Sequence, residues 1–168
     1  MDLELHQLDR RYESLRPACR DRDSRVLASL SRDGQQLPVV VVAGTDAGRF
    51  ILVDGYKRVR GLFKLGQDIV QATCWDLPEQ EALLLGWFMR SADGESALEQ
   101  AWLLRELRDR FQLSLEELAR RFSRSSSWVS RRLGLVKELP EAIQELVRRG
   151  LLAPHAAIYC WHAPKRQH

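Results

Sequence analysis

The sequence predicts an α+β protein in which a small α/β part, residues 1–92, precedes an all-helical part, residues 93–168. Two apolar, mostly β-branched runs, 38–43 and 50–53, flank a turn that contains two glycines, as in a β-hairpin. After Pro78 the apolar residues recur at intervals of three and four, the period of amphipathic helices. Because strand patterns occur only before this change, we expect a mixed front part and a helical back part.

The other elements of the front part lie on either side of the hairpin. Residues 1–33 are charge-rich and are expected to be helical, with Gly34 ending the helix. Beyond the hairpin, residues 56–65 predict a short helix that Gly66 stops. Residues 68–75 alternate loosely between apolar and polar and predict a third strand.

The back part is expected to consist of helices separated by short turns. Apolar residues between Leu98 and Phe111 recur at three and four residues and predict an amphipathic helix. Residues 114–136 predict two short helices joined by a tight turn, which is a helix-turn-helix. Residues 140–149 predict one more helix, which Gly150 closes.

Composition and charge narrow the class of protein. The 168 residues are 45% hydrophobic, enough for a packed core, and the net charge of +3 suggests nucleic-acid binding only if it is concentrated in one place. Cys19, Cys74 and Cys160 are far apart and indicate neither a metal site nor a disulfide scaffold, as in a reducing cytoplasm. No apolar run approaches the ~20 residues of a membrane-spanning helix, so we expect no membrane partner.

Serines stand where a helix-turn-helix needs caps and a turn. Ser114 can cap the first helix, with Glu117 three residues later completing a capping box. Ser123 occupies the turn, where a positive φ and therefore glycine are common. Ser125 or Ser126 can cap the second helix.

The helix-turn-helix is predicted to present a basic surface to DNA. Six basic residues and no acidic residue occur from Arg120 to Lys137. The first turns of the second helix enter the major groove in this motif, where Arg131 can bond guanine in bidentate fashion while the other arginines contact phosphates. The predicted DNA-binding residues are Arg120, Arg121, Arg124, Ser125, Ser126, Ser127, Ser130, Arg131 and Arg132. The alternative is a helical hairpin with a solvated basic surface.

Residues 54–61 predict an anion site where a strand leads into a helix. Backbone N–H groups at a helix start are unpaired and attract phosphates, and Gly55 lets a ligand approach the backbone. Lys57, Arg60 and Lys64 recur on one helical face with Arg58 beside them, while Val59, Leu62 and Phe63 are expected to face the core. The alternative is a surface helix with solvated arginines.

Three segments resemble the ParB-type family of bacterial chromosome and plasmid partition proteins. Ser29-Leu30 followed by Gly34-x-x-x-Pro38 resembles the opening box of the family. Leu52-Val-Asp-Gly-Tyr-Lys-Arg-Val-Arg-Gly61 resembles its arginine-rich phosphate box, Gly-Glu-Arg-Arg-x-Arg-Ala, and residues 113–156 resemble its helix-turn-helix and the helices that follow. The resemblance covers residues 20–158 and implies a front domain with the ParB/sulfiredoxin-like fold.

The resemblance also implies a ligand, partners and a location. It implies a specific double-stranded DNA site, a homodimer on that DNA, a ParA-type ATPase partner, and a cytoplasmic, nucleoid-associated protein of bacteria. It further implies a CTP pocket, with Mg²⁺, whose occupancy closes a clamp on DNA. Carried over by position, the phosphate-binding residues are Gly55, Lys57, Arg58, Arg60 and Arg90.

The sequence departs from the family at the positions that support hydrolysis. The family box Glu-Asn-x-x-Arg corresponds to Gly86-Trp87-Phe-Met-Arg90, so that only the arginine is retained. The side chains of Gly86 and Trp87 offer no oxygen to a Mg²⁺-triphosphate, and we therefore expect no catalytic residue and no metal-ligating side chain. Open alternatives are a CTP hydrolase, a metal-dependent nuclease, and a non-hydrolysing transcriptional regulator or adaptor. The sulfiredoxin reaction is disfavoured because Tyr56 stands where that enzyme has its cysteine.

Overall fold

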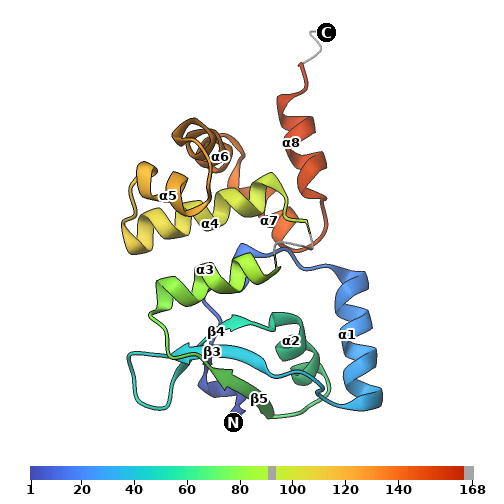
Figure 1. Ribbon diagram of the computed structural model, residues 1–168. Helices are drawn as coiled ribbons and strands as arrows, with labels where there is room; N and C mark the ends of the chain where they lie inside the picture. Colours follow the sequence, from blue (N-terminus) through green and yellow to red (C-terminus); the bar gives the residue numbers. More distant parts are fainter. Residues whose placement is uncertain (91–93, 165–168) are drawn as a thin grey trace. The chain divides into compact units, whose positions relative to one another are not determined.

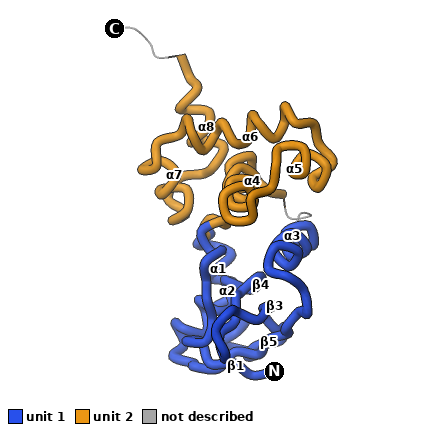
Figure 2. The backbone as a smooth tube through the Cα atoms, turned by 90° about the vertical axis from the view of Figure 1, so that its left-hand side faces the viewer, with its two compact units in different colours: residues 1–14, 19–92 blue, residues 15–18, 93–168 orange. Residues whose placement is uncertain are grey.

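The computed structural model describes residues 1–90 and 94–164, and the chain divides into two compact units. Unit 1 comprises Met1–Ser14 and Cys19–Ala92, and unit 2 comprises Leu15–Ala18 and Asp93–His168 (Figure 2). The four residues Leu15–Ala18 group with the helical unit, where the backbone N–H of Ala18 donates to the carbonyl of Arg148 at 2.8 Å. Each unit is described separately below.

Unit 1 is built on a mixed five-stranded sheet with the order β1-β5-β3-β4-β2. The strands are β1 (Asp2–Glu4), β2 (Leu8–Asp9), β3 (Val39–Ala43), β4 (Phe50–Asp54) and β5 (Ile69–Cys74). β3 and β4 form the predicted antiparallel hairpin with Val42 opposite Ile51, and β5, also predicted, runs parallel to β3. β1 pairs antiparallel with β5, and β2 pairs parallel with β4.

The sheet of unit 1 curls strongly. The edge strands β1 and β2 are joined only by the 3₁₀ turn η1 (Leu5–Gln7), yet four strand spacings of ~4.8 Å would separate the edges of a flat sheet by about 19 Å. Three residues of 3₁₀ helix advance only about 6 Å. The turn is held by hydrogen bonds from Leu5 N to the Asp68 carbonyl, 2.8 Å, and from Gln7 Nε2 to the Gly48 carbonyl, 3.0 Å.

The expectation that residues 1–33 are helical is wrong for the first 19. Residues 2–9 contain the two edge strands, because Leu3 and Leu8 are buried in the core and their backbone pairs with β5 and β4. A second 3₁₀ turn, η2 (Glu13–Leu15), follows, and α1 extends only from Arg20 to Asp33. Gly34 ends α1 with a positive φ of 71°.

Three α-helices complete unit 1. They are α1, α2 (Tyr56–Lys64) and α3 (Glu79–Arg90), with α1 packed against α2 and α3 against β4 (Figure 1). Val59 and Leu62 of α2 are buried, as expected, whereas Phe63 is 71% exposed and does not face the core. Phe63 immediately follows Leu62 on the helix and therefore points about 100° away from it.

Unit 2 consists of the predicted helices and one more. They are α4 (Ala97–Phe111), α5 (Leu115–Arg121), α6 (Ser126–Glu138), α7 (Glu141–Arg148) and α8 (Pro154–His162) (Figure 1). α4 packs against both α5 and α6, and its Leu104 is buried together with Leu118, Val129 and Val147 of the other helices. Among the described residues, no helix has the length and apolar character needed to cross a membrane.

Candidate nucleic-acid interface and anion site

The local geometry of α5 and α6 is that of a helix-turn-helix. Ser114 Oγ accepts from Glu117 N at 3.2 Å at the start of α5, and Ser125 Oγ accepts from Trp128 N at 3.1 Å at the start of α6. Between them Ser123 has a φ of 52°, which lets Arg124 N reach the carbonyl of Ala119 at 2.9 Å. The caps and the positive φ were predicted, and between the two alternative caps the structure has Ser125.

The predicted DNA-binding residues are mostly on the outside of this helix pair. Leu118, Val129 and Leu133 are buried, so the opposite faces of α5 and α6 carry the polar residues. The exposed members of the set are Arg120, Arg124, Ser125, Ser126, Ser127, Ser130 and Arg131, and the half-buried members are Arg121 and Arg132. Ser127, Ser130 and Arg131 lie at positions i, i+3 and i+4 of α6 and therefore share one exposed face.

Two of these arginines are held by neighbouring side chains. Arg132 Nε donates to Gln100 Oε1 of α4 at 3.0 Å, and the Arg132 guanidinium lies 5.2 Å from the centre of the Trp128 ring. The Arg124 guanidinium lies 5.3 Å from the same centre. Burial, and then the charges of Arg124 and Arg131, lower the pKa of Arg132. Trp128 was not among the predicted binding residues, although its four-residue spacing from both arginines is visible in the sequence.

The predicted anion site lies where β4 ends and α2 begins. Gly55 starts α2 with a φ of 103°, and a Cβ at this position would lie 2.5 Å from Val39 Cγ1. Both the left-handed backbone and the close approach of β3 therefore require glycine. Tyr56 is buried and donates from its hydroxyl to the Leu52 carbonyl at 2.7 Å.

Arg58 and Arg90 converge on Asp54 at this point. Arg90 Nη1 donates to Asp54 Oδ1 at 2.6 Å and to the Val53 carbonyl at 3.0 Å. Arg58 Nη2 lies 3.4 Å from Asp54 Oδ2, and its Nη1 donates to the carbonyls of Leu37 and Pro38. One carboxylate thus lies between two guanidinium groups that come from residues 32 positions apart. This is an arrangement in which a phosphate could take the place of the carboxylate.

Arg60 lies in a different environment from Arg58. Its Nε and Nη2 donate to the two oxygens of Asp23 at 3.0 and 3.1 Å, and its Nη1 donates to Glu13 Oε1 at 2.7 Å. Positions i and i+2 of a helix do not face each other, so the structure does not bring Arg58 and Arg60 together. Burial and then the charge of Arg22 lower the pKa of Lys57, despite the nearby charge of Asp23.

Gly86 and Trp87 are both inside unit 1. Trp87 is 2% exposed, and a Cβ on Gly86 would lie 2.8 Å from Val53 Cγ1. A carboxylate side chain at position 86 would therefore need the Val53 side chain to shift. Within residues 1–90 and 94–164, no group of three or more His, Cys, Asp and Glu side chains is placed to hold a metal ion.

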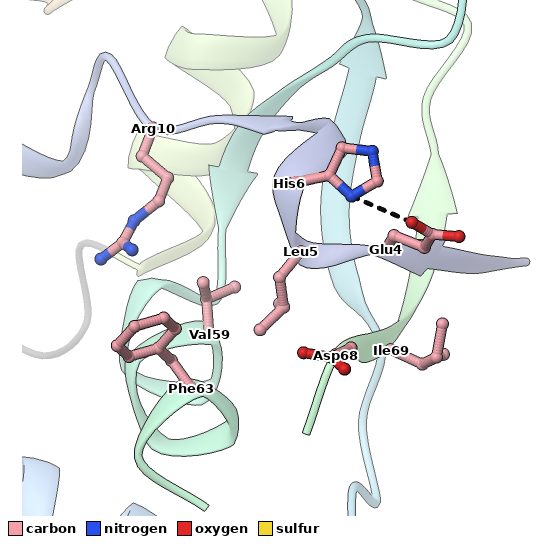
Figure 3. A pocket seen from close by; sticks show the side chains of 8 residues that line it. All are labelled: Glu4, Leu5, His6, Arg10, Val59, Phe63, Asp68 and Ile69. Atoms are coloured by element: carbon pink, nitrogen blue, oxygen red, sulfur yellow. Dashed lines mark ion pairs between the residues drawn. The ribbon is translucent and has the colours of Figure 1, made fainter. Parts of the chain in front are cut away.

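A separate hollow of about 750 Å³ lies beside α2, where it is lined by Val59 and Phe63 (Figure 3). Its apolar lining is Leu5, Val59, Phe63 and Ile69, and its polar lining is Glu4, His6, Arg10 and Asp68. His6 Nδ1 and Glu4 Oε2 are 2.9 Å apart at its rim. None of the predicted site residues lines this hollow.

Comparison with known proteins finds a family match for the helical unit and similar proteins for longer parts of the chain. Residues 95–160, which contain α4 to most of α8, match the family model of the ParB HTH domain. A nucleoid occlusion protein of Geobacillus thermodenitrificans is 29% identical over 119 residues, 70% of this chain and 42% of that protein. A probable chromosome-partitioning protein ParB of Treponema pallidum is 27% identical over 150 residues, 86% of this chain and 45% of that protein.

A solved structure extends the likeness to the fold of the whole chain. The Pnob8-like ParB-N domain is 17% identical, with a TM-score of 0.53 over 98% of this chain and 69% of that one. The chain spans less than half of the length of the curated relatives that it matches. The family match identifies residues 95–160 as a ParB HTH domain, and the chain as a whole is similar to ParB-type proteins.

Proposed function

We propose that the protein binds double-stranded DNA at a specific sequence through α5 and α6. The observation that supports this most strongly is the exposed face of α6 formed by Ser127, Ser130 and Arg131, in a segment from Arg120 to Lys137 without an acidic residue. B-DNA admits one α-helix into its major groove, where arginine discriminates guanine by two hydrogen bonds. Arg120 and Arg124, outside this face, are suited to the flanking phosphates.

The names of two relatives support the bacterial chromosome as the target DNA. One is named for nucleoid occlusion and another for chromosome partition, and both names concern the bacterial chromosome. By the same likeness we infer a homodimer on DNA, a ParA-type ATPase as a partner and a nucleoid location. A regulator or adaptor without a partition role would bind DNA in the same way but would not engage such an ATPase.

Binding selection from a randomised duplex pool tests the proposal. We expect one sequence to be enriched and to bind at least about 10³-fold more tightly than a scrambled duplex at the same salt concentration. The affinity for both duplexes should fall steeply between 50 and 200 mM salt, because arginines displace condensed counterions. A pool that remains random after selection would contradict sequence-specific binding.

We further propose that Arg58 and Arg90 bind the phosphates of a nucleotide, which by resemblance to the family is CTP with Mg²⁺. The supporting observation is the single carboxylate of Asp54 between the two guanidinium groups, beside the glycine start of α2. The side chains of Gly86 and Trp87 offer no oxygen for metal-assisted hydrolysis, so we expect binding without turnover. Arg60 and Lys57 lie toward α1 and would have only an indirect role.

Calorimetric titration with CTP and Mg²⁺, with and without the selected duplex, tests the nucleotide proposal. Arg90→Gln should weaken binding at least tenfold. Asp54→Asn should strengthen binding several-fold because it removes the negative charge that competes with the phosphates. Arg22→Gln, an exposed change on α1, serves as the matched control. Absence of binding by the native chain and by Asp54→Asn would exclude this site, and phosphate release would contradict the argument from Gly86 and Trp87.

A further inference from the structure

Trp128 gathers two arginines at the start of α6. Its indole is 8% exposed and packs near Phe122, with a distance of 6.1 Å between ring centres. The guanidinium of Arg124 lies over the ring at 5.3 Å, and that of Arg132 lies over it at 5.2 Å. Trp128 therefore lies in contact distance of one arginine before the helix and one in its second turn.

The positive charges around this ring repel one another. Arg124 and Arg131 both lower the pKa of Arg132, in addition to the larger effect of burial. The contact with the indole face and the hydrogen bond from Arg132 to Gln100 Oε1, 3.0 Å, hold the cluster together. A negatively charged ligand would relieve this repulsion.

We propose that Trp128 is a positioning residue that orders Arg124 and Arg132 as a clamp for backbone phosphates of DNA. This inference rests on the proposed DNA binding and adds a residue to it, because Trp128 itself need not touch DNA. An arginine fixed against an aromatic ring loses less rotamer freedom when it binds a phosphate. The phosphate backbone is the same at every sequence, so the clamp contributes to affinity and not to base discrimination.

The clamp is tested by measuring DNA binding at several salt concentrations. The variants are Trp128→Leu, Trp128→Phe, Arg124→Gln and Arg132→Gln. The slope of log K against log salt falls by about 0.9 for each phosphate that the protein no longer neutralises. We expect each arginine variant to lower the slope by about 1 and Trp128→Leu by up to about 2, with equal reductions in affinity for selected and scrambled duplexes. Trp128→Phe retains an aromatic face and should stay within about 0.5 of the native slope. Trp161→Leu and Arg149→Gln, exposed changes in the same unit, are the matched controls.

The outcomes separate this inference from the proposed function. A native chain that binds no duplex overturns both. A native chain that binds specifically, together with a Trp128→Leu variant that keeps the native slope, overturns the clamp alone. If Trp128→Leu does not fold, NMR relaxation of the Nε–H groups of Arg124 and Arg132 in the DNA-free native chain tests the clamp instead. Order parameters near 0.85 support the clamp, and values below about 0.6 overturn it.

Discussion

Trp102 Nε1 donates a 2.8 Å hydrogen bond to Gln144 Oε1 in the interior of the helical unit. Gln144 is 1% exposed, and its amide nitrogen donates to the carbonyls of Leu139 at 2.8 Å and Val136 at 3.2 Å. This side chain therefore joins α4 to the end of α6, and it satisfies backbone carbonyls that the helix end leaves without a partner.

Replacing Gln144 with Leu should lower the free energy of unfolding by about 3 kcal/mol. The change leaves the indole N–H and two carbonyl oxygens buried without a partner, each a cost of about 1–3 kcal/mol before relaxation. Urea unfolding followed by circular dichroism measures the loss. The double variant Trp102→Phe/Gln144→Leu should lose less unfolding free energy than the two single variants lose together. Full additivity would show that the hydrogen bond does not couple the two residues.

Glu13 should make unit 1 sensitive to acid. Burial acts to raise the pKa of Glu13, but hydrogen bonds from Arg10 and then Arg60 outweigh it, and the pKa lies below its ordinary value of 4.5. A carboxyl group with a lowered pKa stabilises the folded state fully above its ordinary value, and this stabilisation is lost as the pH falls through the lowered value. We expect Glu13→Gln to cost about 1–2 kcal/mol at pH 7 and progressively less as the pH falls below 4.5.

Urea midpoints of the native chain and of Glu13→Gln between pH 7 and pH 3 check this expectation. Asp2→Asn, a change at an exposed carboxylate of the same unit, should show no comparable difference. If the urea midpoints of the native chain and Glu13→Gln differ by the same amount at every pH, packing and not charge accounts for the loss of stability.

Gly86→Ala should lower the free energy of unfolding by about 1 kcal/mol. The added methyl would lie 2.8 Å from Val53 Cγ1, an overpacking cost of about 1–3 kcal/mol, while alanine gains about 1 kcal/mol over glycine inside a helix. In a Val53→Ala background the clash is gone, and the same change should stabilise the protein. Thermal unfolding of the native chain, Gly86→Ala, Val53→Ala and the double variant measures the stability change that Gly86→Ala causes in each background. Stabilisation in the native background would show that position 86 has room for a side chain.

Arg131 and Arg120 should differ in how they affect DNA binding. Arg131→Ala removes a side chain from the exposed face of α6 and should cost about 1–3 kcal/mol on the selected duplex, with less effect on a scrambled one. Arg120→Ala should weaken binding to both duplexes alike and lower the salt slope by about 1. Fluorescence anisotropy at three salt concentrations measures both quantities. Equal losses on the two duplexes for Arg131→Ala would reject its role in base discrimination.

The elements that the sequence predicted well are those defined by local patterns. The hairpin of β3 and β4 follows from two apolar runs around a glycine turn, and the caps at Ser114 and Ser125 follow from residue types and spacing. The strands in residues 2–9 were missed because they are only three and two residues long and exist through pairing with distant strands. Their signal in the sequence is limited to Leu3 and Leu8.

The candidate sites were predictable as residue types but not as contacts. The sequence shows that arginines follow Gly55, but not that Arg58 and Arg90 share Asp54 while Arg60 pairs with Asp23. These partners are separated by up to 37 residues and meet only through the fold. The stacking of Arg124 and Arg132 on Trp128 could have been expected, since each lies four residues from it in the sequence.

The curl of the sheet has a consequence for its dynamics. One short peptide, residues 2–9, covers the outer hydrogen-bonding groups of both β4 and β5. The two margins of the sheet are therefore not independent, and detachment of this peptide would open both at once. The outer amides of β4 and β5 should accordingly exchange their hydrogens with the same opening free energy, because one detachment event exposes both strands.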